Sequence, residues 1–387
     1  MSDAGSPAIA TAKPRIGEGR IGSFLCASIG LLSVAAVLCL RFPAYLTTPE
    51  LRTHYDVELL RLVLAIAMVV AAGLGVLAIA LGGTRLRAVR LRAIIGLTAL
   101  FLAMLLGGPY VATSDFTQPR FYFGLDWLVL DLFFTGAAFA TLEAIFPKIR
   151  PDQPPLREGW QLDLGYFGVN HLAIGVFLVT STHFAHDYFA WAVFPTVQSY
   201  VLAMPAIVRF LLVILAADAV EYTAHRALHE VPFLWRIHAV HHSPQALDWL
   251  AGSRLHFLEP LVTRACVLVP IFVLGFPQST IFAYVIFISV QSVLIHSNIK
   301  INAGWLRYVI VTPQFHHWHH ASDAEAIDKN YTAHTPLWDL LFGTWHLPPD
   351  RWPVKYGTVK PIPGGMFAQF LYPITGPLAA FREHHDK

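Results

Sequence analysis

The chain has 387 residues, of which 55% are hydrophobic and only 13% are charged, and its mean hydropathy is +0.53. This composition lies outside the range of ordinary soluble domains and indicates an integral membrane protein. The formal net charge of +2 excludes the strongly basic surface that is typical of nucleic-acid binding. The three cysteines lie in apolar stretches without CxxC spacing, which excludes a cysteine-rich zinc site or a disulfide framework.

Six apolar runs before the first histidine cluster are each long enough to cross about 30 Å of hydrocarbon. They lie at 22–41, 62–82, 93–112, 125–146, 163–181 and 199–220. The first run is longer than the core of a signal peptide and lacks a small-residue cleavage site, so we interpret it as a retained span. The sequence therefore predicts an all-α, polytopic membrane bundle with about six crossings.

Basic residues between the apolar runs predict the orientation of the bundle. Lys13 and Arg15 precede the first run, four arginines follow the second, and Lys148 and Arg150 follow the fourth. These segments fall on one side of the membrane, which the positive-inside rule makes cytoplasmic. The sixth crossing returns the chain to that side, so a cytoplasmic, histidine-rich helical cap is predicted from His225 onward.

A further apolar stretch at 263–295 is interrupted by Gly-Phe-Pro-Gln at 275–278. This turn signal divides the stretch into two arms. The two arms run over roughly 263–274 and 279–297. We predict a re-entrant helical hairpin that enters and leaves by the cytoplasmic face, with His256 just before it and His296 at its end.

Thirteen of the nineteen histidines lie between His225 and His346. Most of them form three groups with helical spacing: His225 and His229; His238, His241 and His242; and His316, His319 and His320. Residues at i, i+3 and i+4 share one face of a helix, so each group can direct several imidazole nitrogens toward one point. The groups therefore predict a metal site. His317 is rotated by about 100° from the face of its group and is not predicted to be a ligand.

The number of histidines predicts two metal ions, because about eight ligands exceed the four to six positions that one first-row ion offers. A pair of zinc ions is one alternative. Iron is favoured, because imidazole-rich sites also suit iron and the apolar setting indicates a lipid, whose C–H bonds need activated oxygen. Glu221 and Asp218, one and two turns before His225, either fix the tautomers of ligands or mark the end of a span.

The three groups stand in the motifs HRALH, HAVHH and HHWHH, with the hairpin between the second and the third. This order resembles the HxxxH, HxxHH and HxxHH boxes of the fatty acid hydroxylase/sterol desaturase superfamily of membrane-bound di-iron oxygenases. The flanking text is also similar: RLHFLEP at 254–260, HSN at 296–298, NY at 330–331, WD at 338–339 and LFGT at 341–344. The resemblance covers about 125–350.

This resemblance implies a non-haem oxidoreductase of lipid metabolism that binds two iron ions and uses molecular oxygen to hydroxylate or desaturate a sterol or fatty acyl lipid. Matching the boxes makes eight histidines metal ligands, and His296 matches an additional histidine of the family. The ligands so implied are His225, His229, His238, His241, His242, His296, His316, His319 and His320. His256 and His334 stay open between metal ligand, hydrogen-bond partner of a ligand and loop histidine. No catalytic residue beyond the ligands is implied.

We divide the chain into accessory N-terminal membrane segments at 1–120, a catalytic domain at 121–350 and a C-terminal tail at 351–387. The tail contains an apolar patch at 366–381 that is expected to lie on the membrane or on the domain surface. The sequence shows no fused haem-binding carrier, which predicts a separate electron donor, either a ferredoxin or a cytochrome with its reductase. The preference for arginine over lysine and the alanine-rich spans favour a bacterial inner membrane.

Two other classes of function are alternatives. A transmembrane haem electron carrier would hold haem between histidines on facing spans at membrane depth. A non-redox zinc hydrolase would use the same nitrogen donors without oxygen. Beside the boxes, Trp235 and Trp318 could line an acyl or sterol cleft, but they are expected to be anchors at the membrane interface. Asp339 is expected to fix a turn or to pair with an arginine.

Overall fold

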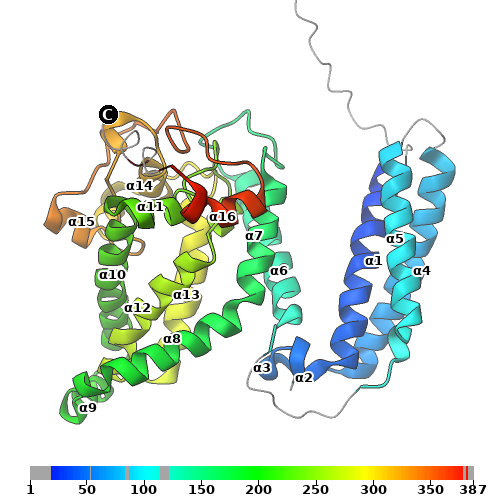
Figure 1. Ribbon diagram of the computed structural model, residues 1–387, viewed down its shortest axis with the longest axis horizontal. Helices are drawn as coiled ribbons and strands as arrows, with labels where there is room; N and C mark the ends of the chain where they lie inside the picture. Colours follow the sequence, from blue (N-terminus) through cyan, green and yellow to red (C-terminus); the bar gives the residue numbers. More distant parts are fainter. Residues whose placement is uncertain (1–18, 53, 83–86, 114–121, 378–380, 382–387) are drawn as a thin grey trace, which may run out of the picture. The chain divides into compact units, whose positions relative to one another are not determined.

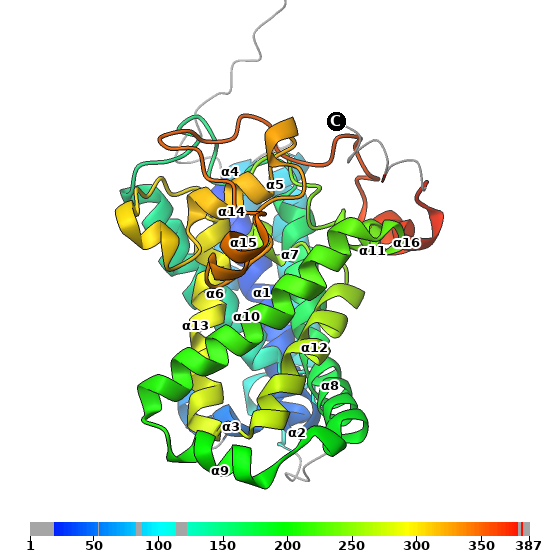
Figure 2. The ribbon, with the colours of Figure 1, turned by 90° about the vertical axis from the view of Figure 1, so that its left-hand side faces the viewer.

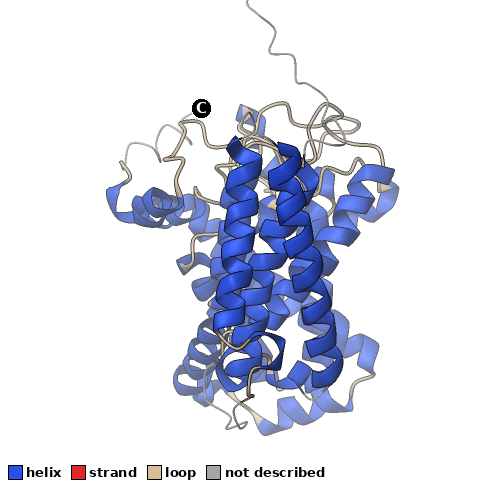
Figure 3. Ribbon diagram, turned by 90° about the vertical axis from the view of Figure 1, so that its right-hand side faces the viewer, coloured by secondary structure: helices blue, strands red, loops and turns tan. Residues whose placement is uncertain are grey.

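The computed structural model describes residues 19–52, 54–82, 87–113, 122–377 and 381. In these ranges every regular element is a helix, as predicted, and β pairing is limited to two isolated bridges (Figure 3). The chain divides into two compact units, Met1–Trp127 and Leu128–Lys387. The predicted basic leader with Lys13 and Arg15 lies outside the described residues.

The first unit contains three long helices and several short ones (Figure 1). Its elements are α1 (Arg20–Arg41), α2 (Pro43–Leu46), α3 (Pro49–Arg52), α4 (Val57–Gly82), α5 (Arg87–Leu105) and the 3₁₀ helix η1 (Gly108–Tyr110). The first three predicted spans fall on α1, α4 and α5, and each of these helices is long and apolar enough to cross a membrane.

Small residues allow α1 to lie close against α5. A Cβ atom on Gly30 would stand 2.5 Å from the carbonyl oxygen of Gly96, and one on Gly96 would stand 2.5 Å from the backbone of Cys26. Lipid tails are as apolar as leucine, so helices in a bilayer associate through close van der Waals packing. The contact between α1 and α5 therefore depends on glycine.

The substitution Gly96→Val is expected to separate α1 from α5 and to destabilise the first unit by about 1–3 kcal/mol, as overpacked contacts do. Cys26, which is fully buried, should then react faster with a thiol reagent in a variant whose Cys39 and Cys266 are serine. Gly73→Val is the matched control, because a Cβ atom there meets no atom within 4 Å. Equal protection of Cys26 in both variants would contradict the packing argument.

The second unit is built from helices that alternate with irregular loops. Its elements are α6 (Leu125–Ile145, which begins just before the division), α7 (Trp160–Leu172), α8 (Ile174–Phe189), η2 (Ala190–Ala192), α9 (Pro195–Ala203), α10 (Ala206–Glu230), α11 (Pro232–His238), η3 (Ala251–Ser253), α12 (Leu258–Leu274), α13 (Gln278–His296), η4 (Gly304–Tyr308), α14 (Pro313–His319), η5 (Ala324–Ala326), α15 (Leu337–Phe342) and α16 (Met366–Thr375).

The fifth and sixth predicted spans are each divided between two helices, so the prediction of a single helix at each position was wrong. The fifth run is divided at Ala173, after which α8 leaves the direction of α7 (Figure 1). The sixth run is divided at Met204 and Pro205. Proline has no N–H to continue α9, and its fixed φ suits the start of α10. Among the described residues, five helices are long and apolar enough to cross a membrane, namely α1, α4, α5, α6 and α13.

The two arms of the predicted hairpin are present as α12 and α13 (Figure 2). Gly275 ends α12 with φ +68°, a conformation that glycine adopts without strain, and Pro277 precedes α13. Both helices pack against α10. The hairpin therefore places the start of α12 and the end of α13 beside the end of α10, while its re-entrant course through a membrane stays a prediction.

A cap of short helices and loops covers the end of the second unit where α10 ends, α12 begins and α13 ends (Figures 1 and 2). It contains α11, α14 and α15, and the chain after residue 351 folds back onto it. Ser322 donates its backbone N–H to the carbonyl of Lys355, and Tyr372 of α16 packs against Trp235 of α11. The outward side chains of α16, such as Phe367, are exposed, as expected for a surface patch.

Candidate metal centre

Nine buried histidines meet in the cap in two neighbouring groups. In each group, one ring nitrogen from every member lies within 4.8 Å of the others. The five-histidine group consists of His225, His229, His238, His242 and His319, and the four-histidine group consists of His241, His296, His316 and His320. The structure thus brings together all nine histidines that the sequence selected, and the second and third boxes each contribute to both groups.

Four segments deliver these side chains. The last two turns of α10 carry His225 and His229, α11 and the turn that follows carry the second box, and α13 ends on His296. The third box lies on α14, where Thr312 accepts a hydrogen bond from the backbone N–H of Phe315 and Pro313 occupies the first turn. A short, firmly capped helix therefore presents the third box to both groups.

The spacing of the nitrogens fits metal coordination. The Nε2 atoms are 2.9 Å apart in the pair of His225 and His238, 3.0 Å in the pair of His242 and His319, and 2.9 Å in the pair of His316 and His296. Two nitrogens that each bind one ion at about 2.1 Å, with a right angle between them, lie about 3 Å apart. Both groups therefore have the dimensions of a coordination sphere.

Backbone carbonyls fix the tautomers of several of these rings. Nδ1 of His225 donates to the carbonyl of Tyr331 at 2.6 Å, that of His241 to Arg254 at 3.1 Å, that of His296 to Ser292 at 2.6 Å and that of His319 to Lys329 at 2.9 Å. A carbonyl can only accept, so in each neutral ring Nδ1 carries the proton and Nε2 carries a lone pair.

This tautomer has a direct consequence for His241 and His296. Their Nε2 atoms are 3.3 Å apart, and both atoms carry lone pairs when Nδ1 is protonated. Two lone pairs at this distance repel each other, and a cation between them converts the repulsion into coordination. The donor set therefore fits a metal ion.

Burial keeps the rings in the neutral form that binds metals. It lowers the pKa of His242, His319 and His320 well below the usual value near 6.5, and the neighbouring imidazoles lower it further. All three are therefore unprotonated at neutral pH, as metal ligands must be.

A buried carboxyl group contacts one ligand. Glu259, at the start of α12, places Oε1 2.9 Å from Nδ1 of His238. This residue stands in the RLHFLEP segment at 254–260, but its contact with His238 was not predicted from the sequence. Asp218 was considered for such a role and does not have it, because its carboxylate accepts the backbone N–H groups of Ala333, His334 and Thr335.

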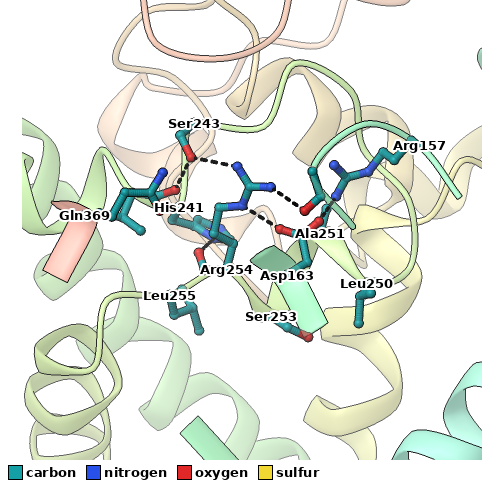
Figure 4. A network of polar contacts seen from close by, with 12 residues as sticks. Arg157, Asp163, His241, Ser243, Leu250, Ala251, Ser253, Arg254, Leu255 and Gln369 are labelled. Atoms are coloured by element: carbon teal, nitrogen blue, oxygen red, sulfur yellow. Dashed lines mark hydrogen bonds and ion pairs between the residues drawn. The ribbon is translucent and has the colours of Figure 1, made fainter. Parts of the chain in front are cut away.

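A buried ionic network supports the carbonyl that orients His241 (Figure 4). Arg254 donates to Asp163 and to the hydroxyl of Ser243, and Arg157 donates to the other oxygen of Asp163. A further ion pair of this network joins Arg157 to Asp248 at 3.0 Å. This cluster of two arginines and two aspartates ties the start of α7 to the loop that follows the second box.

Three other histidines use their ring nitrogens elsewhere. His334 contacts the hydroxyl of Tyr284 at 3.2 Å and Oε1 of Gln291 at 3.1 Å. His256 contacts the carbonyl of Phe370 at 3.0 Å and the backbone N–H of Leu258 at 3.3 Å. His317 contacts the hydroxyl of Tyr356 at 2.8 Å and the carbonyl of Ser297 at 3.1 Å. The two positions that the sequence left open are thus outside both groups.

The neighbouring aromatic residues differ from expectation. Trp235 and Trp318 were expected to be membrane anchors, which is wrong: they are only 2% and 1% exposed. Trp235 packs on the rings of His229 and His242. The role predicted for Asp339 is confirmed, because its carboxylate accepts hydrogen bonds from the backbone of Tyr331 and Thr332 and so fixes the turn that precedes α15.

Comparisons with known proteins agree with this geometry. The fatty acid hydroxylase family matches residues 210–344. The chain is 31% identical over 171 residues to the ornithine lipid hydroxylase OlsE of Rhizobium tropici, covering 44% of this chain and 52% of that protein. It is 30% identical over 148 residues to human alkylglycerol monooxygenase, covering 38% and 32% of the two chains.

A plant relative has a name that describes a different reaction, aldehyde decarbonylation. The chain is 30% identical over 181 residues to the very-long-chain aldehyde decarbonylase GL1-1 of Oryza sativa subsp. indica, covering 43% of this chain and 28% of that protein. The chain thus spans about half, or less, of the length of these relatives. No solved structure matches it. The segment that matches the fatty acid hydroxylase family, residues 210–344, carries all nine clustered histidines.

Proposed function

We propose that this protein is a membrane-bound, iron-dependent oxygenase that hydroxylates a lipid. The observation that carries the proposal is the convergence of nine buried imidazoles in two adjacent groups, at the end of an apolar helical bundle. The five-histidine group would hold one iron ion and the four-histidine group the other. Iron bound there would supply the activated oxygen that an unreactive C–H bond requires.

The residues of the chain have three tasks in this reaction. Carbonyls and Glu259 hold the ligand rings in one tautomer and orientation. The buried cap excludes bulk water from the centre. We propose that an acyl or alkyl chain reaches the centre from the side of the apolar helices, because His225 and His229 lie near the end of α10, which runs from the bundle into the cap.

The stoichiometry requires an electron donor. Insertion of one oxygen atom of O₂ into a C–H bond leaves the second atom to be reduced to water by two electrons and two protons. We propose that a separate carrier, a ferredoxin or a cytochrome with its reductase, supplies these electrons on the cytoplasmic side of a bacterial inner membrane.

Two relatives narrow the proposed reaction. Their names describe a hydroxylase of ornithine lipid and a monooxygenase of alkylglycerol, so hydroxylation is favoured over desaturation and a polar lipid with a long alkyl or acyl chain is the proposed substrate. A haem carrier is disfavoured, because ring centroids such as those of His296 and His316, 4.3 Å apart, leave no room for a macrocycle between them.

Comparative lipid mass spectrometry tests the proposal. Cells that express the wild-type chain should contain a lipid whose mass is higher by one oxygen atom, and cells that express His241→Ala or His319→Ala should lack it. These two variants remove one ligand from each group. A loss of two hydrogen atoms instead would indicate desaturation, and identical lipids in all three strains would contradict the oxygenase.

Glu259 provides a prediction that separates orientation from direct ligation. Glu259→Ala is expected to weaken metal binding about 10–100-fold, the usual effect of removing a side chain that contacts a ligand ring and orients it. Glu259→Gln should retain most of the affinity, because its amide oxygen can take the place of Oε1, 2.9 Å from Nδ1 of His238. Metal competition titrations on the purified variants measure both effects, and equal affinities for all three proteins would show that this contact does not orient His238.

A further inference from the structure

His317 is a buried histidine of the third box that belongs to neither metal group. Its Nε2 lies 3.1 Å from the carbonyl of Ser297, and its Nδ1 lies 2.8 Å from the hydroxyl of Tyr356. A carbonyl only accepts, so Nε2 carries the proton and Nδ1 accepts the hydroxyl proton of Tyr356. His317 therefore forms a continuous hydrogen-bonded link from Tyr356 to the residue that follows His296.

Tyr356 lines an open recess of about 460 Å³ in the surface of the cap. Arg150 and Lys355 also line this recess, and none of its described lining residues is acidic. Arg150 stacks over the ring of Tyr356 at 4.6 Å from its centroid and donates to the carbonyls of Gln245 and Val354, which fixes the ring in place. The recess is thus cationic, with a firmly held aromatic ring in its wall.

The recess lies outside the apolar spans. Arg150 follows the end of α6 at Ile145, and Lys355 lies in the chain that folds back on the cap. Asp323 accepts hydrogen bonds from the backbone of Val354 and Lys355 and does not itself line the recess. A water-soluble partner with a negative surface can therefore approach the two cations without meeting the bilayer.

We propose that this recess is the docking site of an acidic, one-electron carrier protein, and that Tyr356 and His317 link the docked carrier to the four-histidine group. The inference rests on the proposed oxygenase function. Opposite charges at such a surface accelerate encounter and fix the orientation of the partner. Each docked carrier is oxidised by one electron, and two successive docking events deliver the two electrons that one hydroxylation consumes.

A few covalent bonds and hydrogen bonds connect the recess to the four-histidine group. It passes from the ring of Tyr356 through its hydroxyl to the ring of His317, and from there to the carbonyl of Ser297. Ser297 is bonded to His296, and His317 is bonded to His316. Both of these neighbours belong to the four-histidine group, so the recess communicates with that group from two directions.

The test uses the full chain in nanodiscs of zwitterionic lipid. Two acidic probes are used: a plant-type [2Fe–2S] ferredoxin and the soluble haem domain of a b-type cytochrome. The affinity of each probe for the metal-free protein is measured by biolayer interferometry, and reduction of the iron-loaded protein by the reduced probe is followed by stopped-flow absorbance. Photoreduced deazaflavin, a small reductant, serves as the control donor.

At low ionic strength, Lys355→Glu is expected to weaken binding of the active probe and to lower its second-order rate about tenfold, an effect that added salt removes. Lys300→Glu, an exposed site outside the recess, should bind and react like the wild type. Tyr356→Phe should keep the affinity and lose part of the saturating reduction rate, because the hydrogen bond to His317 is gone.

Two results would overturn the docking proposal: neither acidic probe reduces the wild-type centre, or Lys355→Glu reacts with the active probe as fast as Lys300→Glu does. The oxygenase is judged separately. Lipid product formed with deazaflavin and oxygen would leave the proposed function intact even if docking fails, whereas the absence of product with every donor would count against the function itself.

Discussion

Replacing His316 with alanine is expected to remove one of the two metal ions and to lower the rate of lipid oxidation by about 10³-fold or more, because a metal centre contributes several kcal/mol to catalysis. His316 belongs to the four-histidine group, and its Nε2 faces those of His296 and His320 at 2.9 and 3.0 Å. Product formation by purified protein and metal content per chain are the two measurements.

His334→Ala is the matched control for this prediction. His334 is also buried, but both of its ring nitrogens contact Tyr284 and Gln291. Its replacement should lower stability by about 1–3 kcal/mol, because buried polar partners are left unsatisfied, while both metal ions are retained. Loss of a metal ion from His334→Ala, or full activity in His316→Ala, would contradict the assignment of ligands.

The substitution Asp163→Ala is expected to destabilise the second unit by about 3–5 kcal/mol, the usual result of removing one partner from a buried ion pair. Asp163 is fully buried and joins Arg157 to Arg254. Its loss leaves two buried guanidinium groups with a single carboxylate, Asp248, which pairs with Arg157.

Unfolding in mixed micelles, followed by tryptophan fluorescence, measures this change. Glu230→Gln is the control, because the pair of Arg226 and Glu230 is solvent-exposed and should contribute less than about 1 kcal/mol. Asp163→Ala should also weaken metal binding in the four-histidine group, since Arg254 provides the carbonyl that orients His241. If the two variants unfold at the same denaturant concentration, the buried network does not stabilise the cap.

The sequence predicts the helical class and eight of the nine grouped histidines from local periodicity, whereas His296 was selected only by the resemblance to a family. Spacing of i, i+3 and i+4 places ligands on one face of a helix. The turn at Gly275 is indicated by the glycine itself and by the proline two residues later. The division of the sixth run at Pro205 was also readable, since proline ends the preceding helix. The fifth run has no such residue at its break near Ala173.

What the sequence could not predict depends on contacts between distant segments. Helical spacing does not divide nine histidines into a group of five and a group of four, because the second and third boxes each serve both groups. The contact of Glu259 with His238 requires α12 to start beside α11. Spacing also does not predict whether His334 is a ligand, because its two ring nitrogens contact Tyr284 and Gln291 of α13.

The number and kind of metal ions in the purified wild-type chain test the central claim most directly. Elemental analysis combined with X-ray absorption at the iron edge should find two iron atoms per chain, each surrounded by nitrogen ligands at about 2.1 Å, as the spacing of the imidazoles requires. A single metal ion per chain, or zinc in both groups together with turnover that does not need oxygen, would contradict the account.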